Sequence, residues 1–172
     1  FIFSVVVSFT AFGQVRQFSS GPDYKKDIAD LTALIKKYPD SVNYYLKRAA
    51  LVYEINSSYP KQTQTDLKMK DVIPDLNKAI SIQPNNASLY EQRGEYKWEI
   101  NQDTTGALID KSKAIELEPT NPRWLDKRGT LYVELHDYDK ACIDYTKGAE
   151  MGDEICKRGK ENFCPTKKKG GY

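Results

Sequence analysis

Residues 79–86 read Ala-Ile-Ser-Ile-Gln-Pro-Asn-Asn, and residues 114–121 repeat the pattern as Ala-Ile-Glu-Leu-Glu-Pro-Thr-Asn. A degenerate copy, Leu-Ile-Lys-Lys-Tyr-Pro-Asp-Ser, occupies residues 34–41. In every copy an apolar segment ends at a proline, and the three prolines, Pro39, Pro84 and Pro119, lie 45 and 35 residues apart. Because a proline disfavours helical geometry in the residue before it, each copy indicates the end of a helix.

A second marker has the same spacing. Ala49, Gly94 and Gly129 are small residues that each follow an arginine, and they too lie 45 and 35 residues apart. Two independent markers therefore indicate one period of about 34 residues, with an insertion in the first copy and one extra residue in the second. A helix of this length can bury its apolar stripe only against a neighbour, so the period predicts stacked pairs of helices.

The pattern resembles the tetratricopeptide repeat (TPR), which has a small residue early in its first helix, alanines in its second helix and a closing proline. The resemblance covers about residues 23–151, although Lys111 stands where the family prefers an aromatic residue and Gly148 where it prefers alanine. It implies an all-α fold, a right-handed solenoid of antiparallel helix hairpins. We expect about three TPR-like repeats, a lone N-terminal helix and a C-terminal capping helix.

The expected helices form one repeat domain over residues 23–164. The lone helix covers 23–37, and the paired helices cover 42–56 with 71–83, 87–101 with 104–117, and 122–136 with 138–151. The capping helix covers 153–163, and capping is expected because an open end would leave an apolar face in water. Residues 56–70 form the predicted insertion loop, and the basic tail 165–172 is expected to be disordered.

The N-terminal segment predicts export. Residues 1–13 contain no charge and end in Ala11 and Gly13, so they read as the remnant of a signal peptide followed by a linker over 14–22. The chain starts at Phe1, so we expect its first residues to be missing. A membrane anchor is the alternative, but thirteen residues fall short of the roughly 20 needed to span a bilayer. We therefore expect a periplasmic or secreted protein without a transmembrane segment in its mature form.

Three cysteines, Cys142, Cys156 and Cys164, all lie near the C-terminal end. Export would allow a disulfide to persist. A capping helix that returns antiparallel brings Cys164 beside Cys142, whereas Cys156 lies too near the turn. We therefore predict a Cys142–Cys164 disulfide, and the alternative is three small apolar side chains.

Charge and motif content exclude several functions. The net charge is +2, but the last sixteen residues contribute +5, which leaves −3 for the rest and argues against a nucleic-acid partner. His136 is the single histidine, and no metal-ligand or nucleophile motif accompanies it. We expect no enzyme activity, no metal and no cofactor.

The resemblance implies that the first helices line a concave groove, which would take a peptide or a partner helix of unknown identity. The residues it places there, by position, are Lys47, Tyr53, Glu91, Gln92, Glu95, Trp98, Arg123 and Lys127, together with Asn43, Glu54, Glu99, Asp126, Thr130 and Glu134. Tyr53 and Trp98 are the strongest candidates because aromatic residues dominate interface hot spots. Packing between helices is the alternative for both. A protein-binding scaffold is the favoured function, and an accessory subunit of a cell-envelope enzyme or transport complex is the alternative.

Each repeat also contains an arginine before its small residue and an aspartate in its second helix. These residues predict three ion pairs within repeats, namely Arg48–Asp75, Arg93–Asp110 and Arg128–Asp144. The planar guanidinium can donate two parallel hydrogen bonds to a carboxylate. The competing interpretation is that the arginines face the groove and bind an acidic ligand.

Overall fold

The computed structural model describes residues 24–58 and 71–164. The predicted signal-peptide remnant, the linker, most of the insertion loop and the basic tail lie outside the described residues. Within them the structure is all-α, with helices α1 (Tyr24–Lys37), α2 (Val42–Ser58), α3 (Val72–Ile82), α4 (Ala87–Asn101), α5 (Thr104–Leu117), α6 (Pro122–Glu134), α7 (Tyr138–Glu150) and α8 (Glu154–Phe163). None of these helices is long and apolar enough to cross a bilayer.

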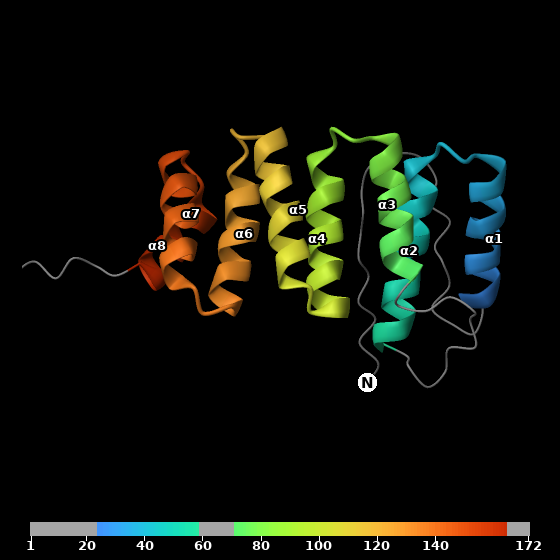
Figure 1. The fold of residues 1–172 in the computed structure, drawn as a ribbon, viewed down its shortest axis with the longest axis horizontal. Helices are drawn as coiled ribbons and strands as arrows, with labels where there is room; N and C mark the ends of the chain where they lie inside the picture. The colour runs from blue at the N-terminus through green and yellow to red at the C-terminus, as the bar shows by residue number, and fades with distance from the viewer. Residues whose placement is uncertain (1–23, 59–70, 165–172) are drawn as a thin grey trace, which may run out of the picture.

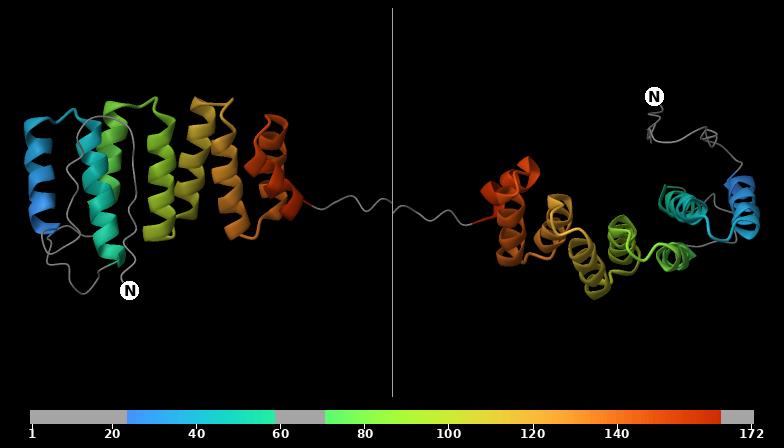
Figure 2. Two further views of the ribbon diagram at one scale, coloured as in Figure 1. Left: turned by 180° about the vertical axis from the view of Figure 1, so that it is seen from behind. Right: turned by 90° about the horizontal axis from the view of Figure 1, so that it is seen from above.

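The helices stand side by side in chain order, each roughly antiparallel to the next (Figure 1). Seen along the helix axes, they form two layers of a gentle arc (Figure 2, right). The first helices of the hairpins, α2, α4 and α6, lie on the inner side, and their partners α3, α5 and α7 lie on the outer side. We call the exposed surface of α2, α4 and α6 the inner face. The expected all-α solenoid of helix hairpins is confirmed.

Side chains in the turns determine where the helices begin. Asn86 and Asn121 accept hydrogen bonds from the backbone N–H groups of Ser88 and Arg123, and Pro122 occupies the first turn of α6. Such N-caps satisfy backbone donors that have no partner inside the helix. Proline fits there because its missing N–H would be unpaired anyway. The caps explain why α4 and α6 begin where the sequence predicts.

Two predicted boundaries are corrected. Helix α2 continues to Ser58, two residues past its predicted end, because Ile55 is fully buried and the side chains of Asn56 and Ser57 bond to carbonyls four residues earlier. Helix α6 ends at Glu134, two residues before its predicted end. His136 follows it with φ 58°, and this left-handed conformation cannot continue a right-handed helix.

The two helices of each hairpin cross closely at the small residues. A Cβ atom placed on Gly94 would lie 3.0 Å from the carbonyl oxygen of Ala107, and one on Gly129 would lie 3.0 Å from the Tyr145 ring. Ala49 is 1% exposed at the equivalent point of the first hairpin. The small residues that define the period are therefore the places where a larger side chain has no room.

The capping helix α8 packs on α7 through a second set of small residues. Gly148 faces the Cys156 thiol, and Gly159 faces the Tyr145 ring. Cys156 is fully buried, and this burial, followed by its hydrogen bond with Asp153, raises the pKa of the thiol to about 12. Gly148, a departure from the family pattern, thus makes room for the cap.

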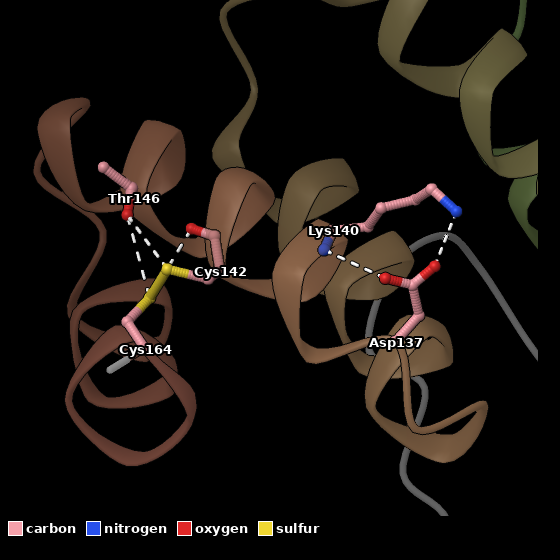
Figure 3. Close-up of a disulfide and its surroundings, with 5 residues drawn as sticks. All are labelled: Asp137, Lys140, Cys142, Thr146 and Cys164. Carbon is pink, nitrogen blue, oxygen red and sulfur yellow. Dashed lines mark hydrogen bonds and ion pairs between the residues drawn. A yellow bond between two sulfur atoms is a disulfide. The ribbon is translucent and has the colours of Figure 1, made fainter. Parts of the chain in front are cut away.

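A disulfide joins Cys142 near the start of α7 to Cys164 at the end of α8 (Figure 3). The hydroxyl oxygen of Thr146 lies 3.9 Å from each sulfur. The antiparallel return of α8 brings the two cysteines together, as expected from the sequence, and leaves Cys156 as the free thiol among the described residues.

Candidate partner-binding face

The three arginines lie between the two helix layers. Each arginine donates two hydrogen bonds to one aspartate. In the pairs Arg48–Asp75, Arg93–Asp110 and Arg128–Asp144, the distance from Nη2 to Oδ1 is 2.6, 2.6 and 2.7 Å, and the distance from Nε to Oδ2 is 2.8 Å in every pair. The aspartate side chains are 7%, 2% and 3% exposed. The hydrogen bond to its aspartate raises the pKa of each arginine. These arginines therefore hold the hairpins together, and their guanidinium groups are not available to a ligand.

Each arginine also reaches the preceding second helix. Nη1 donates to Thr32 on α1, to Asn77 on α3 and to Ser112 on α5, at distances of 3.1, 2.8 and 2.9 Å. In all three cases the acceptor lies sixteen residues before its arginine. One guanidinium thus links two neighbouring repeats. The same bond places α1 in the position of a second helix, so the lone helix expected from the sequence belongs to the repeat pattern.

The second repeat has additional charged contacts. Lys97 Nζ lies 2.9 Å from Asp110 Oδ2, so this carboxylate has two cationic partners. Lys111, where the family prefers an aromatic residue, is 2% exposed and lies 2.5 Å from Glu95 and 3.7 Å from Glu91. A buried lysine is stable only when its charge is paired, and these two glutamates supply that pairing.

The inner face contains most of the predicted partner-binding residues. Gln92 and Arg123 are exposed, and the Glu95 side chain is 42% exposed. Half-buried side chains among the predicted set are Lys47, Tyr53, Glu91, Trp98 and Lys127. The set therefore divides into exposed polar residues and half-buried residues that also contribute to packing between helices.

Tyr53 and Trp98 occupy equivalent positions in the first two repeats. The Tyr53 ring lies 4.7 Å from the Tyr96 ring, so it packs between α2 and α4. Burial and then the neighbouring Glu99 raise the pKa of Tyr96 to about 12. Burial and a hydrogen bond to Glu99 also raise the pKa of Tyr53. The inner face near these rings therefore combines aromatic surface with negative potential.

Comparisons with known proteins identify the fold. No protein-family model matches the sequence, and no curated protein matches it. A structure of MamA protein aligns at 22% identity over 76% of this chain and 64% of its own, with a TM-score of 0.58. A thermophilic TPR protein of Thermus thermophilus aligns at 17% identity over 80% and 72%, with a TM-score of 0.64. The chain has the tetratricopeptide-repeat fold.

A TPR protein of Parabacteroides merdae aligns at 20% identity over 80% of this chain and 51% of its own, with a TM-score of 0.63. The chain thus spans between about half and three quarters of the length of these three structures. At such identities the likeness extends to the TPR fold, and the function has to be argued from the residues of this chain.

The residues that the resemblance places in the groove include one exposed glutamate in each repeat. Glu54, Glu99 and Glu134 are exposed glutamates at equivalent positions near the ends of α2, α4 and α6. Their spacing of 45 and 35 residues repeats that of the small residues and prolines, so a signal for them exists in the sequence.

The described part of the chain offers no site for bound metal. None of its histidine, cysteine, aspartate or glutamate residues form a group of three or more suited to a metal ion. His136 Nδ1 lies 3.1 Å from the Tyr138 hydroxyl at an exposed turn of the third hairpin. This contact positions the turn and does not place the histidine beside a nucleophile.

Proposed function

We propose that this chain is a non-catalytic scaffold that binds a peptide or a partner helix on its inner face. The observation that supports this most is a difference between the two sides of the first helices. Toward the outer layer their charged side chains are paired within the chain, as in Arg128–Asp144. Toward the inner side they present exposed polar residues, including Gln92 and Arg123.

Site-specific photo-crosslinking tests the proposal. A photoreactive residue at Gln92, on the inner face, should yield a crosslinked partner in the native cells. The same residue at Glu116, an exposed position of α5, is the matched control and should yield little or none. Crosslinks to one partner from Glu116 with none from Gln92 would show that binding uses the outer layer.

Trp98 supplies a quantitative test on the partner that crosslinking identifies. Its replacement by alanine should weaken binding by about 2 kcal/mol or more, as expected for an interface hot spot. Helicity and the unfolding midpoint should be measured in parallel, because Trp98 is half-buried. A folded Trp98→Ala protein that binds its partner unchanged would remove Trp98 from the binding surface and leave a packing role.

We also propose that the protein works outside the cytoplasm, as a periplasmic or secreted protein. The pairing of Cys142 with Cys164 supports this, since disulfides persist in oxidising compartments and are rare in the cytosol. Thiol labelling of the protein taken from its native cells under acid quench should modify Cys156 only after unfolding and should modify the other two only after reduction. Immediate labelling of both Cys142 and Cys164 in unfolded protein would contradict the proposal.

A further inference from the structure

The capping helix α8 buries little apolar surface of its own. It has ten residues, and the two that are buried, Cys156 and Gly159, are small. Phe163 is half-buried, and Ile155 is 53% exposed. A helix of fewer than about 12 residues is marginal in water unless other elements support it. The helical state of α8 therefore depends on how firmly it is held against the rest of the solenoid.

Aromatic contacts attach the far end of α8 to α7. The Phe163 ring lies 6.0 Å from the Tyr145 ring and 6.1 Å from the Tyr138 ring. In the described part of the chain no ion pair joins α8 to another helix, and Lys157 pairs with Glu154 inside α8 itself. The charged side chains of α8 thus do not contribute to its attachment.

The turn that precedes α8 has the properties of a hinge. Gly152 has φ 87°, and a Cβ atom placed on it would meet nothing within 4 Å. Glycine adopts many backbone conformations at low cost, so the chain can rotate here. Asp153 accepts a hydrogen bond of 2.7 Å from the backbone N–H of Cys156, so the N-cap of α8 lies on the α8 side of the hinge. The helix can therefore move about Gly152 and keep its cap.

The disulfide attaches the opposite end of α8. Cys164 follows the helix directly, and its bond to Cys142 joins this end to α7 (Figure 3). The two cysteines are 22 residues apart, and the loop that they close contains the whole of α8. A covalent bond across such a loop restricts how far its ends can separate. Both cysteines are half-buried, whereas Cys156 is fully buried, so the disulfide is not enclosed in the core.

We propose that the redox state of the Cys142–Cys164 disulfide controls whether the capping helix stays on the solenoid. A thiolate of a dithiol reductant attacks one sulfur, breaks the S–S bond and forms a mixed disulfide. The second thiol of the reductant then displaces the protein sulfur. The reductant leaves as a disulfide, and its two electrons and two protons end on the thiols of Cys142 and Cys164. Helix α8 is then held by its aromatic contacts and its two small buried residues, and it moves away about the hinge.

The surface that α8 covers is the C-terminal end of the repeat array. Cys156 packs on Gly148, and Gly159 packs on the Tyr145 ring, which is 4% exposed. Repeat arrays require a polar cap at each end because an uncovered last repeat leaves apolar surface in water. One disulfide therefore determines whether this apolar end is covered. The inference concerns the end of the array and is independent of binding on the inner face.

Hydrogen exchange and alkylation of the full chain test the proposal. The oxidised protein is compared with the same protein after reduction by dithiothreitol and removal of the reductant without oxygen. The variant Cys142→Ser/Cys164→Ser, which cannot form the bond, provides a second comparison. Mass spectrometry measures amide exchange in peptides of α8 and, as an internal control, in peptides of α4 and α5. Alkylation by iodoacetamide, located by peptide mapping, shows whether Cys156 has become accessible.

Reduction should accelerate alkylation of Cys156 and amide exchange in α8 by about tenfold or more, whereas exchange in α4 and α5 should change by less than about twofold. The double variant should behave like the reduced protein. Unchanged rates at Cys156 and in α8 would overturn the proposal, because packing alone would then hold the helix. Equal acceleration in α4, α5 and α8 would also overturn it, because the disulfide would then stabilise the whole fold and not a separately moving cap.

Discussion

The second and third repeats have chemically different side chains at the same buried position. Lys111 in α5 and Tyr145 in α7 occupy equivalent positions opposite the small crossing residue of their hairpin. Lys111 is buried against Glu91 and Glu95, whereas the Tyr145 hydroxyl lies 3.2 Å from Thr130, which is equivalent to Glu95. The acidic partners thus accompany the lysine, and a hydroxyl accompanies the tyrosine.

The difference teaches that one repeat position tolerates a buried charge when the facing helix changes with it. In the first repeat the position is Leu76, fully buried in an apolar cluster. The backbone arrangement is similar in the three hairpins, because the small crossing residue and the Arg–Asp pair are retained. The residues that determine the fold can therefore stay the same while the buried side chain at this position differs from repeat to repeat.

The largest loss of stability is expected when the buried tyrosine ring of the third repeat is removed. Tyr145 is 4% exposed, and its ring touches Gly129 and Gly159 and lies 6.0 Å from the Phe163 ring. Tyr145→Ala should lower the free energy of unfolding by about 3–5 kcal/mol, as for other large aromatic residues truncated in a core. Urea unfolding monitored by circular dichroism measures this loss. A loss below about 1 kcal/mol would mean that the capping helix does not depend on this ring.

The Arg–Asp pairs should differ in strength between the same two repeats. Arg128→Met removes the cation that is bonded to the buried Asp144 and should cost about 3 kcal/mol. Arg93→Met should cost only about 1 kcal/mol, because Lys97 still lies 2.9 Å from Asp110. The comparison uses urea unfolding of both variants. Equal losses would show that Lys97 does not compensate.

A double variant can test whether Lys111 and Glu91 stabilise the protein as a pair. Lys111→Met alone removes the cation beside Glu91, whose side chain is 12% exposed, and should cost about 1–2 kcal/mol. Adding Glu91→Gln removes the stranded charge, so the double variant should unfold at a higher urea concentration than the single one. A double variant less stable than Lys111→Met would contradict the pairing of Lys111 with Glu91.

Most of the fold follows from the sequence because its markers are local. The prolines, the small crossing residues and the asparagine caps each act within one turn or one crossing, so their spacing predicts the helices to within about two residues. The Arg–Asp pairs could be predicted for the same reason, since both partners recur with the repeat. The three pairs are present in the structure.

Other features depend on contacts that the period does not encode. The third bond of each arginine, to Thr32, Asn77 or Ser112, links different repeats through three different residue types, so no single motif reveals it. Whether Trp98 packs or binds cannot be read from its position, because half-buried aromatic residues do both. The resemblance places Glu54, Glu99 and Glu134 in the groove, but their exposure required the structure.

A smaller effect is expected at the turns within the second and third hairpins. Gln102 and His136 have φ values of 53° and 58°, in the left-handed region that favours glycine. Gln102→Gly and His136→Gly should each raise the free energy of unfolding by up to about 1 kcal/mol, after the added entropy of the unfolded chain is counted. Thermal unfolding checks both. A lower midpoint in either variant would show that the side chain stabilises its turn.

The smallest change in stability is expected for the exposed Glu54, Glu99 and Glu134, and it tests most directly the claim that the buried Arg–Asp pairs hold the fold whereas exposed charges do not. The measurement is urea unfolding of Glu54→Gln/Glu99→Gln/Glu134→Gln. Its midpoint should lie close to that of the wild-type protein, because the three side chains are exposed and exposed charges contribute little to stability. A fall as large as that of Arg128→Met would show that these exposed glutamates also hold the fold, and it would contradict the claim.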